Sequence, residues 1–319
     1  MESDLQLERV EDLWFPHGNL ILRAENTIFR VHSDILGARS SVFRDMIAFP
    51  QPPQSEGDTL PRQDAVRLHD SAAEFEVFLR AIFDSSFFMP PPSPVTFPAV
   101  IGVMRLAHKY DVQFLFRRAL SHLELLYPTT LSEYQSGRSI PRTTTQHIRE
   151  YHTGNSLSAI RAASEVGTLW ILPTAYYTMI KDSDTIQAIY DDLRPDEVRM
   201  CWTAQLKCAR AVSTTHQFLT GIPTESCASD SCRRVASEAL NNIECWRDDE
   251  VDLDPLDKWV LDYMSPGDAL CSGCGDLGAG MFSEEQRRFW EGMPAMFGLS
   301  SWADLMEMRR EAMKEAMEA

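Results

Sequence analysis

The sequence predicts an α+β chain, in which a small mixed β-sheet wrapped by helices precedes a mostly α-helical C-terminal half. Two observations lead to this prediction. Residues 20–24 and 27–32 alternate apolar and polar side chains on either side of Glu25 and Asn26, as two strands joined by a two-residue turn would. Most later segments instead repeat their apolar residues at helical spacing, and strand-like alternation returns only briefly, at 66–68.

The segment 28–46 joins the second of these strands to two short helices without an intervening loop. Ser33 is expected to cap the first helix, and Ser40 to offer its hydroxyl group to the free amides of the second. Gly37 and the residue after it would end the first helix. The apolar residues of both helices are expected to face the core: Ile35, Leu36, Val42, Phe43, Met46 and Ile47.

The remainder of the first half alternates proline-rich loops with helices. Proline clusters at 50–61 and 89–98 favour extended, exposed backbone. Between them, Ser71 and Glu74 have the spacing of a capping box for a helix that ends near residue 83. The apolar repeats from 100 to 126 predict a helical hairpin.

The order of these segments is similar to that of a known family. The series His32, Leu36, Ser40 and Phe43 resembles the signature His-x3-Leu-x3-Ser-x2-Phe that opens the BTB/POZ fold. Residues 66–83 look like the next strand and helix of that family, and residues 100–124 look like its closing helix pair. The resemblance covers 11–128, which is therefore expected to be a BTB/POZ domain.

The resemblance implies a protein-interaction module and no enzyme. BTB domains form homodimers or pair with other BTB proteins, and many bridge a substrate to a cullin-type ubiquitin ligase. A BTB-type transcription regulator is the alternative, because BTB domains also precede DNA-binding zinc fingers. A departure from the family stands at 16–19, Pro-His-Gly-Asn, where an acidic residue often precedes the first strand.

Composition limits the partners and the compartment. The 319 residues carry a formal net charge of −17, which disfavours contact with nucleic-acid phosphates. No stretch approaches the length of a membrane span, and the start MESDLQLERV lacks the pattern of a secretory signal. We therefore expect a cytoplasmic or nuclear protein, in which seven cysteines serve as reduced thiols or metal ligands rather than disulfides.

The second half is expected to be helical and to begin after a polar boundary near 128–145. We divide it into a helical region, 129–225, and a helical Cys-containing region, 226–319. The latter holds an acidic insert at 247–257 and a final helical region opened by a Ser283/Gln286 capping box. Its cysteines and its tryptophan-containing end resemble the tails attached to BTB domains in large families of mushroom-forming fungi, which carry no known activity.

Four cysteines in two close pairs are the sharpest chemical pattern in the chain. Cys227-x4-Cys232 and Cys271-x2-Cys274 each have a spacing that can hold one edge of a tetrahedral zinc site. An all-thiolate site of this kind is closed and structural, so we expect one structural zinc. Two alternatives remain open: independent reduced cysteines, and a thiol-redox protein that uses the Cys271-x2-Cys274 pair.

Other patterns do not indicate catalysis. The chain has no GxSxG elbow, phosphate-binding loop, HExxH motif or dinucleotide fingerprint. His32 and Ser40 are better explained as structural residues at a strand-to-helix junction. Cys201, Cys208 and Cys245 are expected to be small core residues.

Overall fold

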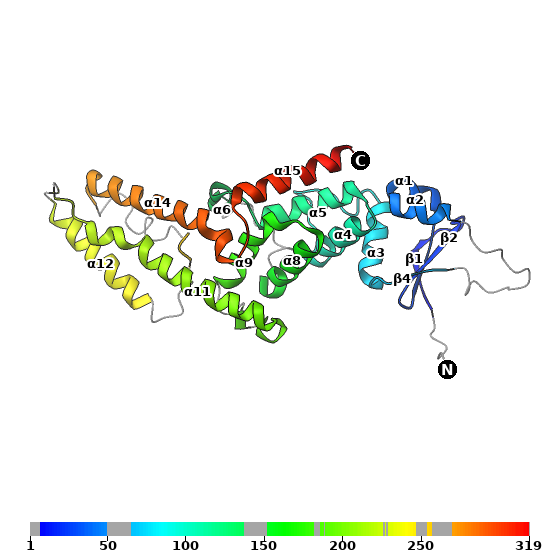
Figure 1. The fold of residues 1–319 in the computed structure, drawn as a ribbon, viewed down its shortest axis with the longest axis horizontal. Coiled ribbons are helices and arrows are strands. Elements are labelled where there is room, and N and C mark those ends of the chain that lie inside the picture. Colours follow the sequence, from blue (N-terminus) through cyan, green and yellow to red (C-terminus); the bar gives the residue numbers. More distant parts are fainter. Residues whose placement is uncertain are drawn as a thin grey trace, which may run out of the picture.

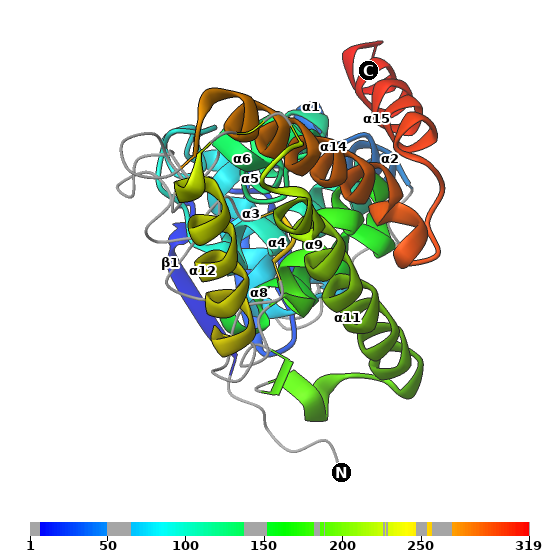
Figure 2. The ribbon, with the colours of Figure 1, turned by 90° about the vertical axis from the view of Figure 1, so that its left-hand side faces the viewer.

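The computed structural model is an elongated molecule with the β-sheet at one end and α11, α12 and α14 at the other (Figure 1). Figure 2 looks along the molecule from the end opposite the sheet, where α12 and α14 lie nearest the viewer. The structure describes residues 7–49, 65–136, 152–181, 186–187, 189–225, 227, 229–246, 254–256 and 270–318.

The sheet is small and mixed, as expected, and its strands lie in the order β1-β3-β2-β4. The hairpin β2–β3 is antiparallel, with Ala24 opposite Thr27 across the turn, and Glu25 takes a positive φ of 51° there. The strands β1 and β4 add to the two sides of the hairpin in parallel orientation. The strand bounds are β1 Glu8–Trp14, β2 Leu20–Ala24, β3 Thr27–Val31 and β4 Val66–Leu68.

Five helices follow the β2–β3 hairpin at the places where the apolar repeats predict them, two before β4 and three after it. Their bounds are α1 Ser33–Arg39, α2 Ser41–Ala48, α3 Ala72–Phe83, α4 Phe97–Lys109 and α5 Gln113–Leu126. The cap of α2 is the predicted one, because the Phe43 amide donates to the Ser40 hydroxyl oxygen at 3.0 Å. The same hydroxyl group donates to the Tyr110 carbonyl oxygen at 2.5 Å, so Ser40 ties α2 to the end of α4.

Two other predicted caps are wrong, because partners distant in sequence take the place of the local ones. Ser33 does not cap α1; its amide donates to the Asn19 side chain at 2.9 Å. The first amide of α3, that of Ala72, donates to the Glu25 carboxylate at 3.1 Å. Glu74 instead accepts from Arg105 on α4, so no capping box forms.

The predicted inward stripe of α1 and α2 is only partly correct. Phe43 is fully buried and stacks on the Tyr110 ring with centroids 4.5 Å apart. Ile35 and Val42, however, are 44% and 41% exposed. These helices have seven and eight residues, so each presents only one or two side chains per turn to the core. Their outer faces mix exposed apolar side chains with four exposed charged residues, Asp34, Arg39, Arg44 and Asp45.

The second half is mostly helical in its described residues, as expected. The predicted start of the last region at Ser283 is wrong, because α14 already begins at Ser272 and Gln286 lies buried in its interior. Its elements are α6 Leu131–Ser136, α8 His152–Val166, η2 Leu169–Ile171, α9 Leu172–Ile180, η3 Tyr190–Asp192, α11 Pro195–Thr215, η4 Gln217–Gly221, α12 Asp230–Trp246, α14 Ser272–Met296 and α15 Trp302–Glu318.

One apolar core connects the two halves. The main cluster of buried residues extends from Leu13 in β1 to Leu305 in α15, with α8 packed on α4. At the centre, Glu124 on α5 accepts from Trp170 at 3.1 Å and from Arg309 at 2.6 Å, which fixes α15 along α5 (Figure 1). Of the boundary predicted at 128–145, residues 128–136 are described and contain α6, whereas 137–145 lie outside the described residues, so that division stays a prediction. No helix among the described residues is long and apolar enough to cross a membrane.

Replacing Phe43 by Ala tests this packing. The change should lower the free energy of unfolding by about 3–5 kcal/mol, through lost burial and the cavity left beside Tyr110. Its neighbour Val42 is the matched control, because a side chain 41% exposed should cost less than about 1 kcal/mol on truncation to Ala. Urea denaturation of both variants measures the difference, and equal stabilities would show that the register of α2 is wrong.

Candidate metal centre

The four cysteines of the two predicted pairs meet at one point. Their sulfur atoms all lie within 4.8 Å of one another, and the Sγ atoms of Cys227 and Cys271 are 3.7 Å apart. Zinc–sulfur bonds of about 2.3 Å in a tetrahedron separate the sulfurs by about 3.8 Å. The cluster therefore has the size of a four-thiolate metal site.

Helix ends position these cysteines. Cys232 lies in the first turn of α12, and Cys271 is the N-cap of α14, with Cys274 in the first turn of that helix. Two intervening residues place Cys271 and Cys274 three apart, so both face the same side of the turn. Cys227 precedes α12 in a short turn, in which its amide donates to the Thr224 carbonyl oxygen at 3.0 Å.

Backbone amides point at three of the four sulfurs. The amide of Cys271 donates to Cys232 Sγ at 3.2 Å, that of Ser229 to Cys227 Sγ at 3.4 Å, and that of Thr224 to Cys274 Sγ at 3.5 Å. The N-terminal ends of α12 and α14 add their positive dipole ends. Such surroundings stabilise thiolates, which are the metal-binding form of cysteine.

The thiols do not ionise independently. The pKa of Cys232 is lowered to about 7, first because the Cys271 amide donates to its sulfur. The pKa of Cys227 is raised to about 12: the Ser229 amide acts to lower it, but burial and the neighbouring thiols outweigh that bond. One thiolate thus opposes the next, and a divalent cation is the partner that lets all four ionise.

A second, smaller apolar cluster surrounds the cysteines. It is separate from the main core and brings η4 against α12 and α14. Cys232 and Cys274 are fully buried, whereas Cys227 and Cys271 are half-buried. The buried members of this cluster are Phe218, Leu219, Ile222, Cys232, Val235, Ala236, Ala239, Cys274 and Phe282.

Two other cysteines behave as the core residues that were predicted. Cys201 and Cys208 are both buried on α11. Burial raises the pKa of Cys201 to about 11 and that of Cys208 to about 12, so both thiols stay protonated near neutral pH. The side chain of Cys245 lies outside the described residues.

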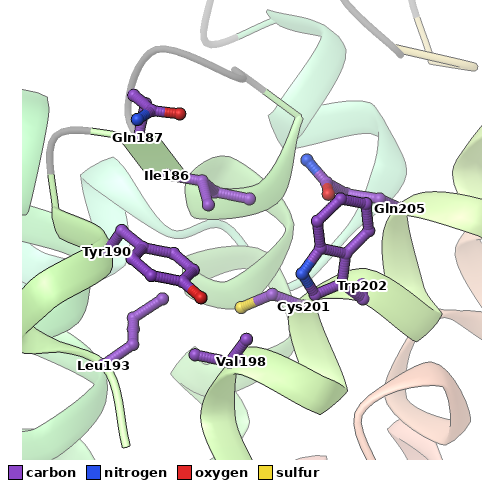
Figure 3. A pocket seen from close by; sticks show the side chains of 8 residues that line it. All are labelled: Ile186, Gln187, Tyr190, Leu193, Val198, Cys201, Trp202 and Gln205. Atoms are coloured by element: carbon purple, nitrogen blue, oxygen red, sulfur yellow. The ribbon is translucent and has the colours of Figure 1, made fainter. Parts of the chain in front are cut away.

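A pocket beside α11 holds one of these thiols (Figure 3). The Cys201 sulfur points into it, and Tyr190 and Trp202 stand at its sides. Its volume of about 210 Å³ is below the range of about 300–1,000 Å³ typical of ligand sites. It is lined by Ile186, Gln187, Tyr190, Leu193, Val198, Cys201, Trp202 and Gln205. Because its pKa is raised, the Cys201 thiol in this pocket is a poor nucleophile near neutral pH.

Sequence reasoning found all four clustered cysteines but missed Thr224 and Ser229, whose amides bond to the sulfurs. Both are small hydroxyl residues next to the first cysteine pair, a composition typical of tight turns that could have indicated them.

Comparison with known proteins found no matching family model, no matching curated protein and no matching solved structure. The residues and their geometry therefore carry the functional argument.

Substitution of Gly278 tests the packing of η4 on α14, which supports the cysteine cluster. A Cβ atom added there would lie 3.0 Å from two atoms of the Phe218 ring, so Gly278→Ala should push η4 away from α14. At Gly280, in the same helix, an added Cβ would meet nothing within 4 Å. Gly280→Ala should stabilise the helix by up to about 1 kcal/mol.

We expect Gly278→Ala to unfold at a lower temperature than Gly280→Ala, because overpacking costs about 1–3 kcal/mol and offsets the gain in helix propensity. Thermal denaturation of the two variants measures this difference. A Gly278→Ala variant as stable as Gly280→Ala would show that η4 and α14 are not in close contact.

Proposed function

We propose that this chain is a non-enzymatic protein-interaction scaffold, built on a BTB-type domain and held at its far end by one structural zinc. The observation that carries the proposal is the order of elements in the first half. A hairpin leads directly into two short helices, a further strand and helix, and a closing helical hairpin. Of the residues that resemble the BTB signature, His32 and Ser40 are the N-caps of α1 and α2, and Leu36 and Phe43 lie within those helices.

The environment of the signature residues supports a structural role for them. Leu36 and Phe43 are fully buried, and Ser40 bonds both α2 and α4. The ring of His32 lies against Phe15, with centroids 5.4 Å apart. These residues shape the fold and form no nucleophile–base pair, which favours binding over catalysis.

The outer face of α1 and α2 is the surface that favours self-association. Ile35, Val42 and Phe49 are large apolar side chains exposed on or beside these two helices. Burying them against a second copy, or against another BTB protein, would remove apolar area from water. In the adaptor form of this proposal, the resulting dimer bridges a substrate to a cullin-type ligase.

The cysteine cluster supports zinc as the cofactor. Four soft thiolate ligands at tetrahedral separation are the donor set of closed structural zinc sites. Since the donors come from α12, α14 and the turn before α12, the metal would crosslink helices that are distant in sequence. The redox alternative has less support, because a dithiol enzyme needs two sulfurs and here four converge.

Zinc content tests this part of the proposal. The full chain, purified under reducing conditions, should contain one zinc per molecule by elemental analysis. Cys232→Ser and Cys274→Ser should each lose the metal and lower the melting temperature, because the ion binds only the folded site. Cys208→Ala, which removes a buried thiol outside the cluster, is the control that should retain zinc.

Chelation should act on one end of the molecule. Hydrogen exchange should accelerate in α12 and in the first turns of α14, while α3, α4 and α5 keep their protection. Protein that contains no zinc when reduced, or a chelator that leaves exchange in α12 unchanged, would rule out a structural metal.

Sedimentation of the full chain tests self-association. At tens of micromolar we expect a dimer, and the double change Ile35→Asp with Val42→Asp should yield a monomer because it places charges on the apolar face. Leu206→Asp is the control, since Leu206 is 61% exposed on α11, far from that face. A stable interface buries upward of about 1,000 Å². A strictly monomeric parent would remove the dimer from the proposal.

A further inference from the structure

Three residues between α12 and α14 lie inside the helical half of the molecule. Asp254, Pro255 and Leu256 are all buried, with Asp254 only 7% and Leu256 only 1% exposed. Acidic residues are almost never buried to this degree without partners. We call these residues the anchor tripeptide. At this depth, the Asp254 carboxylate needs partners inside the molecule.

Side chains from α6 and α9 bind both carboxylate oxygens of Asp254. The Tyr177 hydroxyl donates to Oδ1 at 2.5 Å. Lys181 Nζ donates to Oδ2 at 3.2 Å, and the Tyr134 hydroxyl donates to the same oxygen at 3.4 Å. The Leu256 amide also donates to Oδ1, at 2.9 Å, which folds the tripeptide back on its own carboxylate.

The other two residues of the anchor tripeptide are held as well. Leu256 belongs to the main apolar cluster. The Pro255 carbonyl oxygen accepts from the Gln286 side chain of α14 at 3.4 Å, and Gln286 in turn accepts from Gln135 of α6 at 3.0 Å. The tripeptide thus contacts three helices: α9 and its C-cap through a hydroxyl group and an ammonium group, α6 through a hydroxyl group, and α14 through a side-chain amide.

The site is built for an anionic side chain. The Lys181 side chain is only 27% exposed, so its ammonium group is largely removed from water. Burial acts to lower the pKa of Lys181, yet that pKa is raised, because Tyr134 and Asp254 lie beside the ammonium group. Without a carboxylate, this cation and the buried Tyr177 hydroxyl would lose their strongest acceptor.

We propose that α6, α9 and α14 form a binding site for an Asp-Pro-Leu segment, which the anchor tripeptide fills as an intrachain ligand and which a partner protein's segment of the same chemistry can occupy instead. Recognition has two parts. Tyr134, Tyr177 and Lys181 bind the carboxylate, and the apolar core takes the aliphatic side chain two residues later. This proposal goes beyond the scaffold function and does not depend on the zinc site.

A labelled peptide with the sequence of residues 250–260 tests the proposal in fluorescence anisotropy. The full-length variant Asp254→Asn with Leu256→Ala, whose own tripeptide no longer fits, should bind the peptide. The parent chain should bind it at least about tenfold more weakly, because the covalently attached segment competes. A peptide with Asn in place of the residue that corresponds to Asp254 should bind roughly tenfold to a hundredfold more weakly than the unchanged peptide.

Lysine variants show whether binding uses the proposed site. Adding Lys181→Met to the emptied variant should abolish peptide binding, whereas Lys207→Met, at an exposed position of α11, should leave it unchanged. Absence of binding to an emptied variant that retains its helical circular dichroism would overturn the proposal and leave the tripeptide a purely structural anchor.

If the emptied variant does not fold, the parent chain decides the question. Excess peptide should then accelerate hydrogen exchange at the Leu256 amide, because displacement of the anchor tripeptide breaks the bond between that amide and Asp254. Unchanged exchange at saturating peptide would equally overturn the proposal.

Discussion

The convergence of four sulfurs is the feature that brings the N-terminal ends of α12 and α14 to one point. The apolar cluster at that end is small and separate from the main core, and two of its buried members, Cys232 and Cys274, belong to the cysteine cluster itself. Amides aimed at the sulfurs and two helix N-termini favour thiolates, yet neighbouring thiolates repel one another. In our proposal a divalent cation resolves this conflict, because it would turn mutual repulsion into a crosslink.

The rest of the molecule has a different source of stability. One apolar core runs from β1 to α15, and Glu124 on α5 bonds both Trp170 and Arg309, so the helical half packs directly on the half that contains the sheet. In our proposal, the molecule combines one continuous apolar core, exposed apolar side chains on α1 and α2, and a far end held by a metal ion. This arrangement suits a scaffold, since it presents separate surfaces at the two ends of one elongated body (Figure 1).

Patterns with a short range in sequence were predictable, and contacts between distant residues were not. Alternation predicted the β2–β3 hairpin, the spacing of Ser40 and Phe43 predicted a cap, and the two cysteine pairs predicted the cluster. The cap of α3 was missed because Glu25, distant in sequence, replaces Ser71 and Glu74. The acidic composition of 247–257 indicated an insert, and nothing local showed that Asp254 finds its cation on α9.

X-ray absorption at the zinc edge of the full chain, purified under reducing conditions, would show whether the cysteine cluster holds a metal. We expect a first coordination shell of four sulfurs at about 2.3 Å. This result would place the metal in the cluster of Cys227, Cys232, Cys271 and Cys274, because no other group of cysteines among the described residues converges in this way. A shell that contains nitrogen or oxygen ligands, or a sample with no zinc, would contradict it.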